Sequence, residues 1–149
     1  MKRQQLRYSL LFCLLLSAAF AAWAWFRPYA WQPDIAARCK VKETIVTPDA
    51  SYFWVEVHLK VNPGMTHDLQ KPVWLETASG KKLAPANTTL GGKDGEGTTE
   101  IWGKFWLESA DLNGALTLHL NDGKLIIKGN QGIPQLENST YRYFTTNQW

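Results

Sequence analysis

The stretch FWVEVHLKV, residues 53–61, decides the fold class of this chain. Apolar side chains occupy every second position from Phe53 to Val61, and indole, charged or imidazole side chains fill the positions between them. A period of two is typical of a β-strand that buries one face. Asn62-Pro63-Gly64 follows at once and favours a strand end there.

Segments on both sides of this stretch show the same period. We expect further strands at residues 39–47, 73–77, 82–84, 99–107, 115–120 and 124–128, with a strand or an ordered tail at 141–144. Residues 79–81 predict one hairpin, and residues 121–124 predict a tight type I′ hairpin because Asp122-Gly123 tolerates the two positive φ angles that this turn needs. The polar, glycine-rich segment 87–97 predicts a mobile loop.

About seven short strands, with no amphipathic helix expected after residue 37, are typical of an antiparallel sandwich. The sequence therefore predicts an all-β, immunoglobulin-like β-sandwich at residues 38–149, and one N-terminal transmembrane helix before it. A sandwich of roughly 110 residues is one domain, which can bury enough apolar surface to fold without disulfides or metal.

The N-terminus has the pattern of an export segment. Residues 1–8 are basic and contain no acidic side chain, and residues 9–26 contain no charged side chain. An apolar run of this length nearly spans a bilayer as a helix, and its basic flank stays in the cytoplasm. We expect a cytoplasmic segment at 1–8, a transmembrane anchor or signal at 9–26, a linker at 27–37 and an extracytoplasmic domain. This arrangement corresponds to a single-pass protein of the bacterial inner membrane with its domain in the periplasm.

Whether the apolar segment is cleaved stays open at this level. Residues 19–21 and 22–24 both have the small-x-small form that signal peptidase accepts, and cleavage would release a periplasmic or secreted domain. Trp23, Trp25 and Phe26, with Arg27 beyond them, favour retention because they resemble the aromatic belt at a membrane surface.

Charge and cysteine content exclude two classes of protein. From Arg38 to the C-terminus there are twelve basic and twelve acidic side chains, so the domain has no basic surface of the kind that binds nucleic acid. Cys13 lies in the apolar run, which leaves Cys39 as the single thiol of the domain and excludes an internal disulfide. Cys39 could be buried, free or paired with another molecule.

The order of the expected strands resembles bacterial telokin-like extracytoplasmic domains of unknown function, which are immunoglobulin-like. The matching parts are 53–64, then 74–85 with its strand-Gly-Lys-strand turn, then 101–107 and 116–128. The resemblance implies an exported sandwich and carries no catalytic motif.

No pattern in the sequence predicts catalysis, a metal or a cofactor. His58 and His119 fall on the polar faces of their strands, where we expect solvent-facing side chains, and His67 falls in a loop. The spacing of the histidines and cysteines does not match a zinc site, and segment 91–97 is neither a phosphate-binding loop nor a dinucleotide fingerprint. We therefore expect a protein that is not an enzyme.

Four tryptophans are the candidate binding residues. Trp54, Trp74, Trp102 and Trp106 alternate with the aliphatic side chains of their own strands, so they share a face with charged residues. If the aliphatic face is the core, these indoles form an outward patch that binds a partner. We expect a membrane-anchored domain that binds another envelope protein or supports a complex. The alternatives are a glycan-binding module built on the four indoles, or indoles that simply pack over polar stems.

Overall fold

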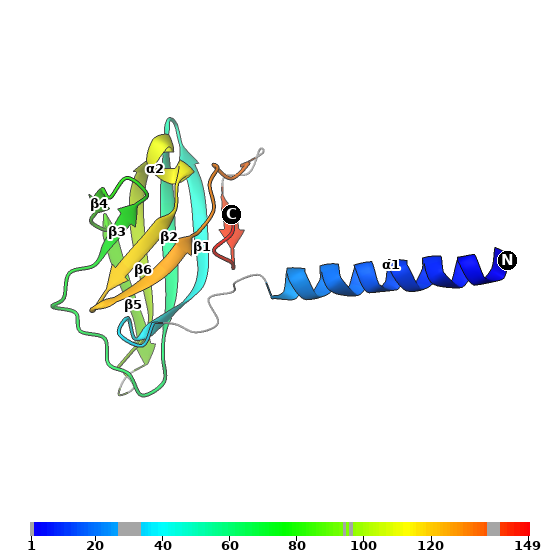
Figure 1. Ribbon diagram of the computed structural model, residues 1–149. Helices are drawn as coiled ribbons and strands as arrows, with labels where there is room; N and C mark the ends of the chain where they lie inside the picture. Colours follow the sequence, from blue (N-terminus) through cyan, green and yellow to red (C-terminus); the bar gives the residue numbers. More distant parts are fainter. Residues whose placement is uncertain (1, 27–33, 94, 96, 137–140) are drawn as a thin grey trace.

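The computed structural model describes the chain except residues 1, 27–33, 94, 96 and 137–140. It contains an N-terminal helix, α1 (Lys2–Trp25), that extends away from a β domain (Figure 1). Most of the linker expected at 27–37 lies outside the described residues, and residues 34–37 form a turn that leads into the first strand.

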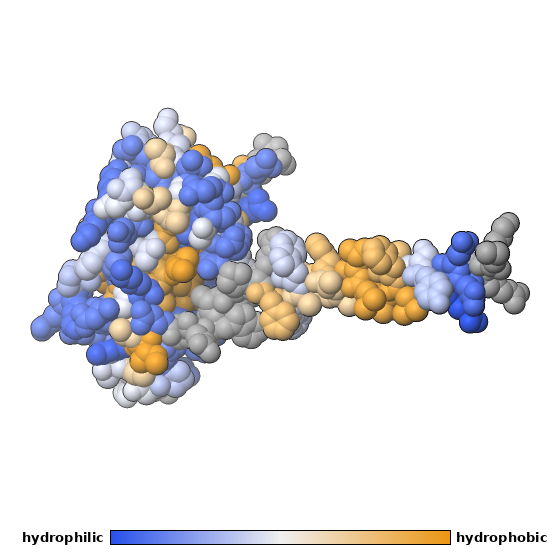
Figure 2. Space-filling view, viewed as in Figure 1, coloured by the Kyte–Doolittle hydropathy of each residue, from blue (hydrophilic) through white to orange (hydrophobic). Residues whose placement is uncertain are grey.

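Helix α1 has the dimensions of a membrane span. Its segment Arg7–Trp25 is 19 residues long with a mean hydropathy of 1.7, and none of it is buried against the rest of the chain. Figure 2 shows an apolar band along this helix with polar groups at its N-terminal end. A helix that is apolar on all sides needs an apolar environment, and this one is long enough to cross a bilayer.

Two antiparallel sheets form the β domain. The larger sheet has the order β5-β6-β2-β1-β9, with β5 (Asn87–Lys93), β6 (Gly97–Glu108), β2 (Tyr52–Val61), β1 (Cys39–Asp49) and β9 (Arg142–Phe144). The smaller has the order β4-β3-β7-β8, with β4 (Lys82–Leu83), β3 (Trp74–Thr77), β7 (Leu116–Leu120) and β8 (Gly123–Lys128). The prediction of a mostly β chain behind one apolar helix is confirmed. The described residues contain nine strands, where about seven were expected, and a one-turn helix α2 (Ser109–Asn113) between β6 and β7.

The aliphatic face of each strand forms the core between the sheets. Val55 and Val57 from β2 are fully buried together with Leu75 from β3, and Leu118 from β7 is 1% exposed. Each such side chain stabilises the fold by about 1.5–3 kcal/mol when it leaves water. Cys39 is also in this core, where burial raises its pKa to about 11. Of the three states open for Cys39, the structure thus shows the buried one.

The prediction of a mobile loop at residues 87–97 is wrong for residues 87–93, while residues 94 and 96 lie outside the described residues. Residues 87–93 form β5, which pairs with β6 from Asn87↔Lys104 to Lys93↔Gly97 and contains a bulge at Gly91/Gly92. Glycine-rich composition disfavours a strand locally, but the long neighbouring strand β6 supplies a partner for the backbone. Gly91 is also required here, because a Cβ on it would lie 2.7 Å from the ring of Trp102.

The hairpin between β7 and β8 is confirmed, but its turn lies one residue earlier than predicted. Leu120 pairs with Gly123, so Asn121 and Asp122 are the central residues, and of these two only Asn121 has a positive φ, 53°. The turn is therefore not of type I′. Gly123 has a different role, since a Cβ on it would lie 2.1 Å from the backbone nitrogen of Ala37. Glycine at this position lets the turn at 34–37 pack against β8.

Candidate functional site

The four candidate tryptophans project outward, as their spacing predicts, but they do not lie on one face. Trp54 belongs to β2 and Trp102 and Trp106 belong to β6, so these three share the outer face of the five-stranded sheet. Trp74 belongs to β3 and lies on the outer face of the four-stranded sheet. Because the two sheets pack through their inner faces, Trp74 is directed away from the other three. The single patch inferred from the sequence is therefore divided.

Trp54 and Trp106 form one aromatic cluster with Tyr52. The two indoles are direct cross-strand neighbours, and the Trp106 ring stacks on the Tyr52 ring with centroids 4.2 Å apart. Trp106 is 41% exposed and Tyr52 is 37% exposed, which makes them the accessible part of this cluster. The sequence analysis did not include Tyr52, although it shares the phase of Trp54 on the same strand.

Polar groups hold the Trp54 indole in place. Its Nε1 donates a hydrogen bond of 2.9 Å to Asp49 Oδ2, and the Nζ of Lys104 lies 4.7 Å from its ring centroid. A cation over an indole face is attracted by the ring quadrupole and covers that face. We refer to Tyr52, Trp54, Lys104 and Trp106 as the aromatic platform.

Trp102 packs over a buried histidine, so only part of its ring faces solvent. Its ring stacks on the His58 imidazole with centroids 4.4 Å apart, and His58 is only 4% exposed. The prediction that His58 faces solvent is therefore wrong. The reason is that the large indole on the neighbouring strand lies directly opposite His58 and excludes water from it.

Two carboxylates flank the His58 ring. Nδ1 lies 2.9 Å from Glu43 Oε1 on β1, and Nε2 lies 3.4 Å from Glu100 Oε2 on β6. Lys42 Nζ also lies 3.6 Å from Glu100. Burial raises the pKa of Glu100, but the charge of Lys42 and the contact with His58 outweigh this effect, so the pKa of Glu100 is lowered. These contacts connect β1, β2 and β6 across the outer face of the sheet.

Trp74 repeats this arrangement on the opposite sheet. Its ring stacks on His119 with centroids 4.9 Å apart, and His119 Nε2 lies 2.5 Å from Glu76 Oε2. Lys82 Nζ lies 5.1 Å from the Trp74 ring. Each sheet thus has an indole, an imidazole and a carboxylate in contact, so Trp74 and Trp102 are engaged with neighbours within the chain.

The geometry separates the accessible aromatic surface from the structural indoles. His58 covers one face of Trp102, His119 one face of Trp74 and Lys104 one face of Trp54. Trp106 is the most exposed of the four. The platform around Trp106 and Tyr52 is therefore the part of the predicted site that a ligand can reach.

The described residues do not place three or more His, Cys, Asp or Glu side chains where they could hold a metal ion. His67 is hydrogen-bonded to Asn121, with its ring Nδ1 3.1 Å from the Asn121 amide. Burial lowers the pKa of His67, Asp68 opposes this effect and Arg38 adds to it.

Comparison of the chain with models of known protein families, with curated protein sequences and with solved structures finds no match. The resemblance to telokin-like domains therefore stays a prediction.

Proposed function

We propose that this protein is a non-enzymatic, single-pass protein of the bacterial inner membrane whose periplasmic β-sandwich binds another envelope protein. The observation that carries the proposal is the aromatic platform, in which Trp106 and Tyr52 stay exposed on a sheet face that also bears charged side chains. Exposed aromatic side chains of this kind are over-represented among the residues that dominate binding between proteins.

Helix α1 supports the proposed anchor. An unburied apolar segment of 19 residues has the length of a bilayer span, and basic residues before it favour a cytoplasmic N-terminus. If signal peptidase cleaves after residue 21 or residue 24, the same domain is instead released into the periplasm or the medium.

We also propose that the sandwich is immunoglobulin-like. The sheet order β5-β6-β2-β1 corresponds to strands D, E, B and A of that topology, and β4-β3-β7-β8 corresponds to an added C′ strand followed by C, F and G. This correspondence uses every strand except β9, which pairs with β1 at the end of the larger sheet. The strand order supports the assignment more strongly than strand lengths do.

The position of the platform on an open sheet face favours a protein partner. The platform lies on the pleated face of β2 and β6, where Glu56 and Glu108 alternate with the aromatic side chains. An aromatic centre with charged residues at its edge is the usual arrangement at interfaces between proteins. We expect the partner to present an apolar surface to Trp106 and cationic groups to the neighbouring carboxylates.

A glycan is the second candidate ligand. The outer side of the Trp106 and Tyr52 stack is exposed, and Asp49 and Glu108, which flank Tyr52 in the strand register, can accept hydrogen bonds from sugar hydroxyls. Trp54, Trp74 and Trp102 each have one ring face covered by a neighbouring side chain. We therefore expect a glycan to contact a short stretch of the surface rather than to lie along a groove.

Site-specific photocrosslinking in cells tests the proposal. We expect a photoreactive amino acid at position 106 to give one adduct of discrete mass, and the same amino acid at Thr117, on the outer face of the other sheet, to give none. Tyr52→Ala should weaken the adduct, while Lys82→Ala should not. Equal adducts from both faces would contradict a protein-binding platform. Co-sedimentation with insoluble peptidoglycan that depends on Trp106 would favour the glycan instead.

A further inference from the structure

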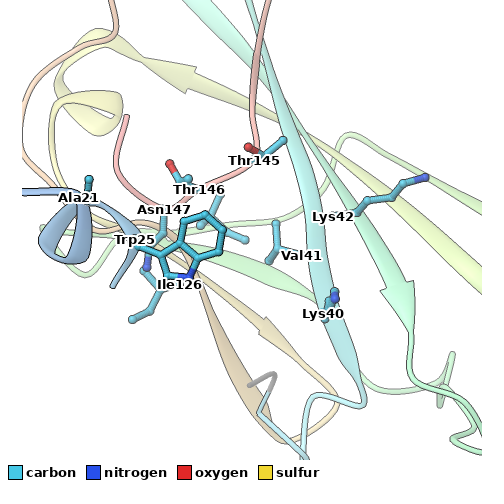
Figure 3. A pocket seen from close by; sticks show the side chains of 11 residues that line it. Ala21, Trp25, Lys40, Val41, Lys42, Ile126, Thr145, Thr146 and Asn147 are labelled. Atoms are coloured by element: carbon cyan, nitrogen blue, oxygen red, sulfur yellow. The ribbon is translucent and has the colours of Figure 1, made fainter. Parts of the chain in front are cut away.

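A pocket of about 660 Å³ lies between the C-terminal end of α1 and the β domain (Figure 3). Ala21, Ala24 and Trp25 line it from α1, while the start of β1, the middle of β8 and the segment 145–147 line it from the sandwich. Figure 3 shows the Trp25 ring among Val41, Ile126 and Thr146. The cavity is thus formed jointly by the predicted membrane span and the domain.

The walls of this cavity are amphiphilic. Val41 and Ile126 supply apolar surface, and Ile126 is 51% exposed. Lys40 and Lys42 lie on one side, but Lys42 pairs with Glu100 at 3.6 Å and is directed away from the Trp25 ring in Figure 3. Within the described residues Lys40 has no ion pair, which leaves its ammonium group available to an anion.

Asn147 gives the cavity a buried acceptor. This residue lines the cavity and is 9% exposed, and its Oδ1 has no hydrogen-bond partner among the described residues. Its backbone oxygen accepts a hydrogen bond from Gly129, which fixes the residue against β8. A buried polar atom without a partner costs about 1–3 kcal/mol. A bound molecule that donates a hydrogen bond to Oδ1 would remove this cost.

The position of the cavity limits what can occupy it. A helix that crosses the bilayer from Arg7 to Trp25 places Ala21, Ala24 and Trp25 at the outer surface of the membrane, where Trp side chains concentrate. Lipid headgroups and the first methylenes of their chains surround the helix at this level. An occupant must therefore combine apolar groups, an anion for Lys40 and a hydrogen-bond donor for Asn147.

We propose that this cavity binds a phospholipid of the surrounding bilayer whose headgroup carries a donor, such as an ethanolamine ammonium group. The phosphate lies at Lys40, the headgroup donor lies at Asn147 Oδ1, and the upper part of an acyl chain lies along Ala21 and Ala24. Small side chains at these two helix positions leave the space that the chain needs. The inference rests on the proposed function, since it requires that α1 is retained and spans the membrane.

Photolabelling of the full-length chain in nanodiscs tests the proposal. The probe is a phosphatidylethanolamine with a photoreactive group near its phosphate, diluted in phosphatidylcholine, and mass spectrometry locates the label. We expect label on the peptides that contain residues 126–127 and 145–147. A phosphatidylcholine probe should label them less, because its headgroup has no hydrogen-bond donor.

Matched variants sharpen the experiment. Ala21→Leu/Ala24→Leu fills the cavity from the helix and should abolish the domain label, whereas Ala18→Leu/Ala22→Leu adds the same side-chain volume at helix positions that do not line the cavity and should preserve it. Lys40→Gln should lower the label about fivefold, the factor expected for one lysine at a lipid surface. Lys93→Gln, on the opposite edge strand β5, should leave the label unchanged.

Label spread evenly over the domain, or label unchanged in Ala21→Leu/Ala24→Leu, would overturn the lipid site. Extraction of the membranes with alkaline carbonate separates this failure from failure of the anchor. A chain that is released by carbonate is not membrane-spanning, which refutes the proposed anchor as well. A chain that stays in the membrane and shows no cavity label refutes the lipid site alone.

Discussion

Lys128 is fully buried on β8 and offers a quantitative test of the fold. Its Nζ donates hydrogen bonds to the backbone oxygens of Asn113 at 3.1 Å, Gly114 at 3.1 Å and Asn130 at 2.9 Å. The first two oxygens lie at the C-terminal end of α2, where carbonyls have no partner within the helix. We therefore expect Lys128→Met, which preserves the side-chain length and removes the donors, to destabilise the sandwich.

The size of the effect follows from these bonds. In the variant, the Asn113 oxygen still accepts a hydrogen bond from the Gly132 nitrogen at 2.8 Å. The other two carbonyl oxygens, those of Gly114 and Asn130, lose the ammonium group without this compensation. Each buried carbonyl left unpaired costs about 1–3 kcal/mol. The variant no longer bears the cost of burying a charged ammonium group, which offsets part of this loss of stability. We expect a net loss of about 2–4 kcal/mol, which lowers the Tm of a domain of this size by about 10–20 °C.

Equilibrium urea denaturation of the full-length chain in detergent, followed by tryptophan fluorescence, measures the loss. Lys124→Met is the matched control, because Lys124 lies on the same strand with an exposed side chain and should change the free energy of unfolding by less than about 0.5 kcal/mol. A Lys128→Met variant as stable as this control would refute the role assigned to the three carbonyls.

The pH dependence provides a second readout. Burial lowers the pKa of Lys128 from its ordinary value of 10.5. The folded chain therefore releases this proton at a lower pH than the unfolded chain does, so this group favours the folded state increasingly as pH rises through the folded pKa. The stability difference between the wild type and Lys128→Met should therefore widen as pH rises from the folded to the unfolded pKa of Lys128. A difference that stays constant over this pH range would contradict the lowered pKa.

Three further predictions concern the core and the sheet faces. In a Cys13→Ser background, Cys39 of the native protein should resist alkylation at pH 8 and react only after unfolding, because burial raises the pKa of this thiol to about 11. Fast labelling of the native protein would contradict this expectation. Gly123→Ala should lose about 1–3 kcal/mol or more in urea denaturation, because the added Cβ would meet the Ala37 nitrogen, and a neutral effect would be inconsistent with this packing. The stability advantage of the wild type over Glu100→Gln should be present at neutral pH and be lost as pH falls through the lowered pKa of Glu100, and an advantage unchanged at pH 3 would exclude the contribution of this carboxylate.

The strands themselves could be predicted because their signal is local. In β2, β6 and β7 the aliphatic side chains alternate with polar ones, and a strand with this pattern can bury only one of its faces. The outward phase of Trp54, Trp74, Trp102 and Trp106 followed from the same alternation and is confirmed. The membrane-span dimensions of α1 are equally local, because they depend on the length and apolarity of one segment.

Strand β5 could not be predicted in this way. Its glycines and threonines carry no period that favours a strand, and it forms because the edge of β6 opposite β2 offers a partner for its backbone. Gly123 illustrates the same limit. Its sequence context favours a turn, but the close approach of Ala37, a residue far away in the sequence, determines its role.

The sequence by itself therefore determined the all-β class, the apolar N-terminal helix and the face on which each tryptophan lies. Only the tertiary structure decided which faces meet, because sheet order depends on contacts between segments that are far apart in the chain. Sheet order separates Trp74 from the aromatic platform, buries His58 beneath Trp102, and brings β1, β8 and residues 145–147 to the end of α1. A pattern of period two gives the direction of a side chain, but the neighbour that covers it comes from another strand.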